Sequence, residues 1–210
     1  MDIVTIDKNC SGEYIEKKSR FISDIIKVTS IEEAKSALDN IKKKYYDAKH
    51  HCFAYRVVED NQIVERQSDD GEPSGTAGMP LLNILQKKEL SNCILIVTRY
   101  FGGILLGTGG LTHAYNEAGK LAIDKCELKK YSFGYEIELD IKYEDNEYFK
   151  HICNVNNFKV EKVEYGENIK YILDLTEKQY EIFNKIKETE GRLSKFEEYK
   201  EKSRKFVEND

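Results

Sequence analysis

The sequence predicts an α+β protein of two domains, residues 1–130 and 131–210. Its length of 210 residues fits one large or two small domains. The pattern of apolar residues starts anew after Lys129-Lys130, which is interpreted as a linker. The residues after it follow a βαββαβ order, which is that of a ferredoxin-like domain. Because this fold serves many functions, it does not by itself indicate an activity.

The first 68 residues are interpreted as two strands, a helix and a further strand. Residues 12–28 alternate between apolar and polar side chains, which predicts an antiparallel strand pair. Ser30 is a helix N-cap followed by apolar residues at helical spacing, and this helix ends near Tyr45. Residues 50–58 are rich in β-forming side chains, and residues 59–68 are interpreted as a polar segment without an element.

The rest of the chain is organised around residues 69–116, which contain both prolines and eight of the thirteen glycines. Glycine at this density is typical of turns and of backbone that passes close to another group. A helix is expected from Gly78-Met79-Pro80, where proline suits a first turn. A buried strand is expected over 92–98. The segment Gly107–Gly110 is interpreted as a loop before a helix that runs from Leu111 to about Cys126.

The second domain is read from alternating strands and two amphipathic helices. The expected elements are a strand at 135–143, a helix at 145–156, strands at 158–165 and 168–175, a helix from Thr176 to a C-cap at Gly191, and a strand at 193–199.

Composition excludes several classes of protein. The 40% hydrophobic and 11% aromatic fractions are sufficient for packed cores. No apolar run reaches about 18 residues, so a membrane helix is not expected. The N-terminus lacks the layout of a signal peptide, which favours a cytoplasmic protein. The five cysteines form no CxxC pair and are expected to be reduced thiols.

The charge is distributed unevenly. Residues 1–130 contain 19 basic and 19 acidic side chains, so the net charge of -5 comes from residues 131–210. An acidic total argues against tight nucleic-acid binding through net charge alone, and no DNA binding is expected. A local basic face is compatible with this composition.

The glycine-rich region favours an anion or backbone-recognition site. The N–H groups of Gly107–Gly110 and the positive end of the following helix would face this loop. Thr108 adds a hydroxyl group, and Arg99 offers a bidentate guanidinium group. The segment is not a Walker A loop, because no lysine follows its glycines. Alternatively, the glycines serve packing and Arg99 pairs internally with an acid of the first loop.

That first loop carries an acidic cluster, Asp69, Asp70 and Glu72, beside Ser74 and Thr76. The carboxylates of this cluster suit the binding of a divalent cation or the role of a general base. The favoured interpretation, however, is a solvated turn with an Asx cap. The spacing of the histidines in the sequence does not indicate that they lie near one another, so no metal site and no cofactor are predicted. No complete catalytic constellation is present, and no catalytic residue is assigned.

The predicted binding residues lie on or beside the two glycine-rich loops and on the 50–58 strand. They are Arg56, Asp69, Asp70, Glu72, Ser74, Thr76, Arg99, Tyr100, Gly102, Gly103, Gly107, Thr108, Gly109, Gly110 and His113.

The motifs DDGEPSGTAGMPLLNIL and VTRYFGGILLGTGGLTHAY resemble those of the IMPACT family, also called the YigZ family. KKSRFI at 17–22 and HCFAYR at 51–56 also fit the N-terminal domain of this family. The acidic C-terminal half fits the small domain that bacterial members append, so the resemblance covers almost the whole chain. One position departs from it: the family has arginine before the Ala-Tyr of its second motif, and this chain has His113.

The resemblance implies an N-terminal domain similar to the second domain of small-subunit ribosomal protein five, a sheet with two helices on one face. It implies a C-terminal domain similar to domain five of elongation factor G. Both of these relatives act on the ribosome or RNA, and eukaryotic members of the family regulate translation initiation. The expected function is therefore a binding protein in translation or its regulation, contacting RNA, the ribosome or a protein partner.

Two alternatives remain at this point. One is an enzyme that holds a small phosphorylated or carboxylated substrate with Arg99 and Gly107–Gly110. The other is a protein-interaction module in which the glycines are only structural.

Overall fold

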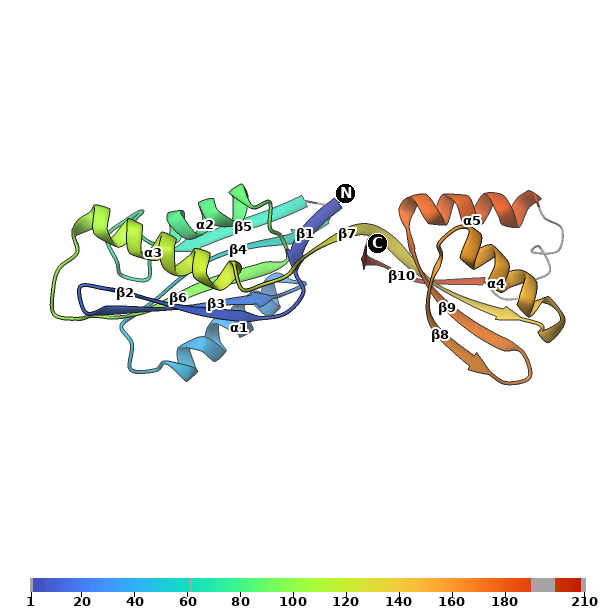
Figure 1. Ribbon diagram of the computed structural model, residues 1–210, viewed down its shortest axis with the longest axis horizontal. Helices are drawn as coiled ribbons and strands as arrows, with labels where there is room; N and C mark the ends of the chain where they lie inside the picture. The colour runs from blue at the N-terminus through green and yellow to red at the C-terminus, as the bar shows by residue number, and fades with distance from the viewer. Residues whose placement is uncertain (1, 61, 190–198, 209–210) are drawn as a thin grey trace. The chain divides into compact units, whose positions relative to one another are not determined.

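The computed structural model describes residues 2–60, 62–189 and 199–208. The chain divides into two compact units, one formed by Ile3–Lys129 and the other by Asp2 with the residues from Lys130 onward. Figure 1 shows the elements of each unit. Among the described helices, none is both long enough and apolar enough to cross a membrane.

The first unit is built on an antiparallel sheet with the strand order β2-β3-β6-β4-β5. Its strands are β2 (Cys10–Glu16), β3 (Ser19–Lys27), β4 (His50–Glu59), β5 (Gln62–Ser68) and β6 (Cys93–Tyr100), and the short strand β1 (Asp2–Ile6) precedes them. The central strand β6 is buried on both faces, which explains its unbroken apolar run.

Helices cover both faces of this sheet (Figure 1). The helices α2 (Gly78–Lys87) and α3 (Gly107–Ile123) pack on one face, where Leu95 and Val97 of β6 point. The helix α1 (Ile31–Lys44) packs on the other face against Ile94 and Ile96. This split follows from the two-residue period of a strand. The expected pair of helices on one face is present, and α1 adds a third layer.

The second unit has the element order that the sequence predicts. The strands β7 (Leu128–Ile141), β8 (Lys159–Tyr165), β9 (Ile169–Thr176) and β10 (Tyr199–Glu208) alternate with α4 (Asn146–Val155) and α5 (Glu177–Thr189) in a βαββαβ order, with a 3₁₀ turn at Tyr143–Asp145. The strand β9 lies between β7 and β8, and β10 pairs with the other side of β7. Apolar residues of the helices and of β7 and β9 form its core.

Three sequence interpretations are corrected by the structure. Lys129-Lys130 joins the two units but is not an irregular linker, because β7 runs through it from Leu128. The polar segment is the strand β5, which lies at the edge of the sheet and is only partly covered. The glycines from Gly107 form the first turn of α3 and not a loop before it. Burial of Leu111 and Tyr115 stabilises a helix start that glycine alone disfavours.

At the C-terminus, the predicted C-cap Gly191 and residues 193–198 of the predicted strand lie outside the described residues. The strand that the structure describes begins at Tyr199, where the predicted one ends.

Candidate functional site

The first glycine-rich loop is organised by Asp69, between β5 and α2. Its carboxylate accepts the backbone N–H groups of Gly75, Ala77 and Gly78 at 2.8–2.9 Å. Burial opposes ionisation of Asp69, but these three N–H groups outweigh it and hold the pKa below its usual value. Asp69 thus fixes the loop and the start of α2 through N–H groups six to nine positions further along the chain.

The neighbouring polar residues of this loop also bond within the chain or face solvent. Asp70 accepts the backbone N–H of His51 at 2.7 Å through its carboxylate and contacts His50 Nδ1 through its carbonyl at 2.8 Å. The Thr76 hydroxyl donates to the carbonyl of Pro73 at 2.7 Å. Ser74 is exposed.

Glu72 and Arg99 form a buried ion pair. Arg99 Nη1 donates to both carboxylate oxygens of Glu72, at 2.7 and 3.0 Å. Both side chains are less than a tenth exposed. Arg99 Nη2 reaches Ser19 Oγ at 3.5 Å, and Nε is the one guanidinium nitrogen without a partner among the described residues. Arg99 therefore joins the two loops internally, which is the structural alternative that the sequence left open.

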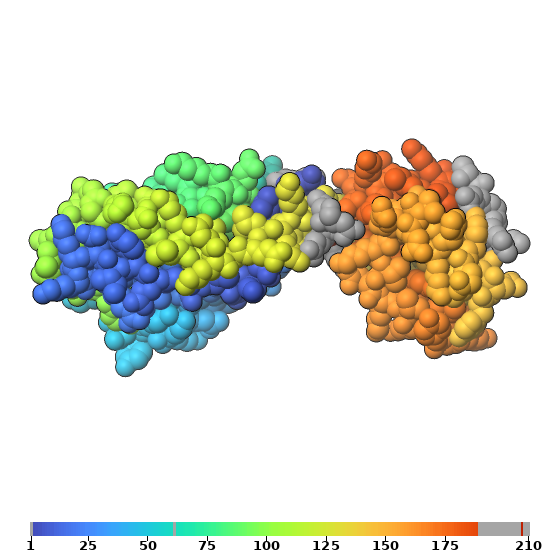
Figure 2. Space-filling model, viewed as in Figure 1, coloured from blue at the N-terminus to red at the C-terminus, as the bar shows by residue number. Residues whose placement is uncertain are grey.

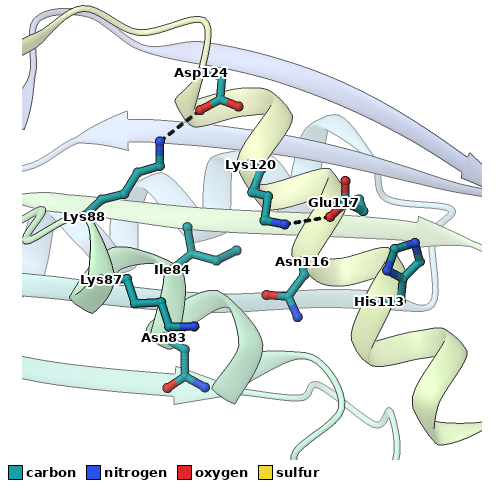
Figure 3. Close-up of a pocket in the computed structure, with 9 residues that line it drawn as sticks. All are labelled: Asn83, Ile84, Lys87, Lys88, His113, Asn116, Glu117, Lys120 and Asp124. Atoms are coloured by element: carbon teal, nitrogen blue, oxygen red, sulfur yellow. Dashed lines mark hydrogen bonds and ion pairs between the residues drawn. The ribbon is translucent and has the colours of Figure 1, made fainter.

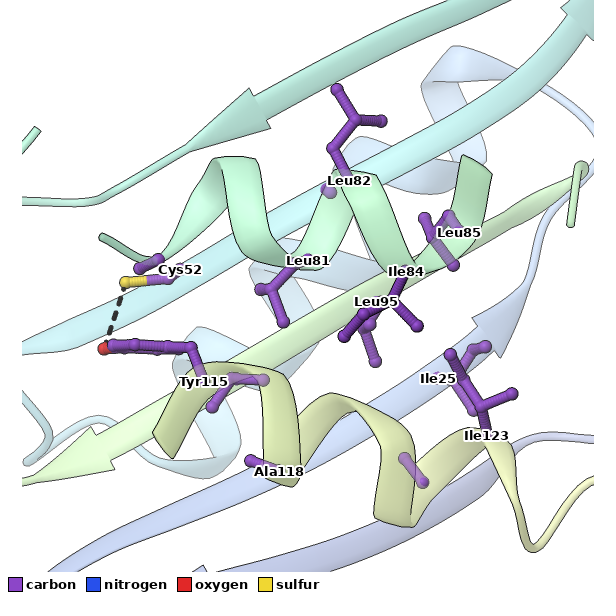
Figure 4. Close-up of a cluster of buried hydrophobic side chains, with 14 of the residues drawn as sticks. Ile25, Cys52, Leu81, Leu82, Ile84, Leu85, Leu95, Tyr115, Ala118 and Ile123 are labelled. Carbon is purple, nitrogen blue, oxygen red and sulfur yellow. Dashed lines mark hydrogen bonds between the residues drawn. The ribbon is translucent and has the colours of Figure 1, made fainter. Parts of the chain in front are cut away.

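The same pair is tied to α3 and β4 through the buried Tyr115 hydroxyl group, whose contact with Cys52 is drawn in Figure 4. Tyr115 donates to Glu72 at 2.8 Å, and Cys52 Sγ lies 3.2 Å from the Tyr115 oxygen. Burial raises the pKa of Tyr115 and raises that of Cys52 to about 12. Both groups stay protonated at neutral pH, so they extend the network without adding charge.

Arg56 lies away from this network. In the pairing of β4 with β6, Arg56 is opposite Cys93, whereas Arg99 is opposite His50. Cys93 and Arg99 are six residues apart on β6, which corresponds to about 20 Å along the strand. Arg56 donates to the carbonyl of Leu85 in the last turn of α2, to that of Leu90 beyond the helix, and to Glu65. Arg56 thus bonds to the C-terminal end of α2 and lies away from the other predicted site residues.

The second glycine-rich loop, residues 101–106, differs in having exposed apolar side chains. Phe101, Ile104 and Leu105 are 54%, 43% and 84% exposed. The first turn of α3 follows, with Gly107, Thr108 and Gly109 exposed and Gly110 partly so, and no side chain caps it. Its backbone N–H groups are therefore open to an external acceptor.

Two more of the predicted residues hold this loop in place. The Gly102 N–H donates to Ser19 Oγ at 3.2 Å, and a Cβ there would lie 2.0 Å from the backbone of Lys18. The Tyr100 hydroxyl donates to Asp47 at 2.6 Å, and that hydrogen bond raises the pKa of Tyr100 to about 12. Gly103 has a φ of +85° and open space around it.

The backbone of Lys18, against which Gly102 packs, belongs to a turn that the site prediction missed. Lys17 and Lys18 form the two-residue connection between β2 and β3, and their φ angles are +45° and +68°. Asn-Gly is the usual choice for such a turn. Both lysines are exposed, and neither has a carboxylate partner within the described part of the chain. The signal was available as a Lys-Lys pair between two alternating runs.

These features lie together at one end of the first sheet. Figure 1 places the β2–β3 turn and the β6–α3 loop at the same end, and Figure 2 shows the two segments adjoining at the surface. We call this the loop surface. It consists of Lys17, Lys18, Phe101, Ile104, Leu105 and Gly107–Gly110.

His113 faces a different feature, a groove of about 530 Å³ between α2 and α3 (Figure 3). Its Nε2 lies 3.5 Å from the Tyr14 hydroxyl. Lys88 and Lys120, which also line the groove, are paired with Asp124 and Glu117. Two of the groove's cations are therefore already neutralised.

Comparisons with known proteins agree on one family. The family model of the Impact N-terminal domain matches residues 17–123. IMPACT family member YvyE of Bacillus subtilis is 32% identical, over 86% of this chain and 82% of the relative. An IMPACT family member of Haemophilus influenzae is 35% identical, over 84% and 87%. A crystal structure described as a hypothetical protein covers 100% of this chain and 98% of its own, with 26% identity and a TM-score of 0.64. The chain belongs to the IMPACT family.

Proposed function

We propose that this protein is a binding protein of translation or its regulation, and that its loop surface contacts RNA, either free or in the ribosome. Family membership supports the translation role through the resemblance described above. The likeness of the two domains, 1–130 and 131–210, to a ribosomal-protein domain and to domain five of elongation factor G is part of the same proposal. The choice of RNA rests on the chemistry of the loop surface.

The observation that carries the proposal is the Lys17-Lys18 turn. A non-glycine residue in the left-handed region costs about 1–2 kcal/mol, and both lysines occupy it. Asn-Gly would form the same turn with less strain. Strain of this kind clusters at binding sites, where the side chains that carry it have another role. Two adjacent ammonium groups held at a turn suit successive backbone phosphates.

The rest of the loop surface provides the other contacts that single-stranded RNA uses. The free N–H groups at the start of α3 suit a phosphate oxygen. The Arg99 guanidinium lies 5.5 Å from the centroid of the Phe101 ring, and the rest of this ring, which is 54% exposed, offers a surface on which a base stacks. A Cβ added at Gly107 or Gly109 would meet no neighbouring group within 4 Å, so a ligand can approach the backbone there.

The roles of Arg99 and Arg56 change in this proposal. Arg99 was the expected anion ligand of both the RNA and the enzyme hypotheses, but its charge is balanced by Glu72 inside the protein. Arg56 bonds to the end of α2. Neither is proposed to contact RNA, and the enzyme hypothesis loses the cation on which it depended. Positioning of the loops is the proposed role of Arg99.

The proposal is tested by measuring binding of single-stranded RNA and of purified ribosomes at two salt concentrations. The test variant is Lys17→Gln with Lys18→Gln, and the matched control is Lys42→Gln with Lys43→Gln on α1, which removes the same charge. Wild type and the α1 control should bind with strong salt dependence. The turn variant should bind weakly, with the slope of log affinity against log salt reduced by roughly one per lysine.

Equal binding by the turn variant and the control would contradict the proposal, because charge at the turn would then not matter. Ribosome binding that is independent of salt and unchanged in the turn variant would instead indicate a protein partner. Absence of binding by wild type to either target would also refute it.

A further inference from the structure

Two cysteines of the first unit lie beside each other although 116 positions separate them in the sequence. Cys10 begins β2, and Cys126 follows the end of α3. The Sγ atoms of both lie 3.7 Å from the same carbonyl oxygen, that of Lys8. Cys10 Sγ also lies 3.4 Å from the carbonyl oxygen of Lys125, the residue directly before Cys126. Among the described residues, no other two of the five cysteines share a hydrogen-bond acceptor.

The backbone around the two thiols is held by further contacts between residues 7–11 and 122–127. Asp7 N–H donates to the Glu127 carbonyl at 3.0 Å, and Lys125 Nζ donates to the Ser11 carbonyl at 2.9 Å. The two segments are thus held against each other by hydrogen bonds that flank the thiols, without a covalent link.

Exposure distinguishes this pair from the remaining cysteines. Cys10 and Cys126 are half-buried, whereas Cys52, Cys93 and Cys153 are buried. Burial excludes oxidants and disfavours the thiolate, which is the reactive form. Disulfides in reducing compartments are typically transient and redox-sensing, and they need one accessible thiol next to a second, resolving thiol.

We propose that Cys10 and Cys126 are a modification site: a thiol pair that peroxides oxidise to an intramolecular disulfide. The Cys10 thiolate attacks one peroxide oxygen, the O–O bond breaks, and a Cys10 sulfenic acid and water form. The Cys126 thiolate then attacks the Cys10 sulfur, the S–O bond breaks, and a second water leaves. In total, two thiols lose two electrons and two protons, and one hydrogen peroxide is reduced to two waters.

The order of the two steps follows from the surroundings of each sulfur. Burial, with the neighbouring Cys10, raises the pKa of the Cys126 thiol to about 12. Cys126 is therefore a poor first nucleophile toward peroxide. Conversion of Cys10 to a sulfenic acid places an electrophilic sulfur beside Cys126. The same conversion removes the Cys10 thiol, which is one of the groups that raise the pKa of Cys126.

The bond would join the start of β2 to the end of α3, which are the elements that carry the Lys17-Lys18 turn and the Gly107–Gly110 turn at their other ends. The inference about the thiols stands without the proposed function, because it is tested by chemistry at the sulfurs alone.

The test exposes the full-length, folded protein to a small excess of hydrogen peroxide, blocks the remaining thiols and maps peptides without reduction. The expected result is a fall from five free thiols to three, with a Cys10–Cys126 linked peptide that thiol reductants remove. Cys126→Ser should show no linked peptide and a Cys10 sulfenic acid that a dimedone probe traps. Cys10→Ser should keep all four of its thiols.

Oxidation without the linked peptide would overturn the inference, as would equal loss of all five thiols in folded protein. Circular dichroism shows whether each serine variant is folded. The wild-type peptide map needs no variant, so it decides the question even if a variant does not fold.

Discussion

The two glycine-rich segments, residues 69–78 and 101–110, look alike in sequence and differ in structure. The first uses its polar groups inside the chain: Asp69 binds three N–H groups, and Glu72 binds Arg99 and Tyr115. The second leaves three large apolar side chains exposed, and its helix start has no side-chain cap. The comparison shows that glycine density marks unusual backbone in both segments, but does not distinguish a loop whose polar groups bond internally from one whose apolar side chains are exposed.

The largest expected effect is on the buried ion pair of the first segment. Glu72→Gln removes the carboxylate and leaves the Arg99 charge buried without a counter-ion. Breaking a buried pair from one side typically costs 3–5 kcal/mol, and we expect about that loss in the free energy of unfolding. Denaturant unfolding of the first unit measures it.

Two controls make this measurement specific. Glu13→Gln breaks the exposed pair with Arg20 and should leave stability nearly unchanged. Adding Arg99→Met to Glu72→Gln removes the unpaired charge and should restore part of the loss. A Glu72→Gln variant as stable as Glu13→Gln would show that the pair is not a structural element of this loop.

The next effect concerns Asp69 and depends on pH. The pKa of Asp69 is lower in the folded protein, so the unfolded state takes up its proton first as the pH falls. Its contribution is therefore present above the unfolded pKa of about 3.9 and is lost as the pH falls through the folded pKa. Asp69→Ala should cost about 2 kcal/mol at neutral pH and less at acidic pH. Unfolding curves at several pH values test this, and a cost that does not change with pH would contradict it.

The glycines offer a matched pair within the second segment. Gly102→Ala places a Cβ against the backbone of Lys18, and overpacking of this kind costs about 1–3 kcal/mol. Gly109→Ala meets no neighbour within 4 Å and adds a better helix former, so it should be neutral or slightly stabilising. Thermal unfolding of the two variants compares them, and equal midpoints would mean that Gly102 does not seat the loop on the β2–β3 turn.

The smallest expected effect is a gain. Lys17→Asn with Lys18→Gly relieves two left-handed residues and should stabilise the protein by about 1 kcal/mol. The same change removes both ammonium groups, so RNA binding should weaken although the fold is more stable. Parallel unfolding and binding measurements separate the two effects. If the variant is more stable and binds RNA normally, the Lys17-Lys18 turn does not contribute to RNA binding.

The sequence predicted most of the elements because their apolar residues follow the period of a strand or helix. Ser30, for example, is the N-cap of α1, and its Oγ accepts the N–H of Glu33 at 3.1 Å. The strand β5 was missed because an edge strand has few apolar residues to reveal it. The start of α3 was misplaced because burial of Tyr115 outweighs the low helix propensity of glycine.

The candidate site was less predictable than the fold, because it depends on pairing between distant residues. Internal pairing of Arg99 with an acid of the first loop was one of the alternatives, but the sequence does not reveal which acid it pairs with, because Glu72 is 27 positions away. Arg56 has the right chemistry and lies at the wrong end of β4. Lys17 and Lys18 were seen as a motif, and only their backbone angles distinguish them from ordinary surface lysines.

We propose that the second segment contacts a ligand and that the first segment only supports it. Amide hydrogen exchange of the protein, with and without purified ribosomes, tests this most directly. We predict added protection of the amides of residues 101–110 and of Lys17-Lys18, with no change over 69–78. Protection over 69–78 alone, or binding that leaves both segments unchanged, would contradict the claim.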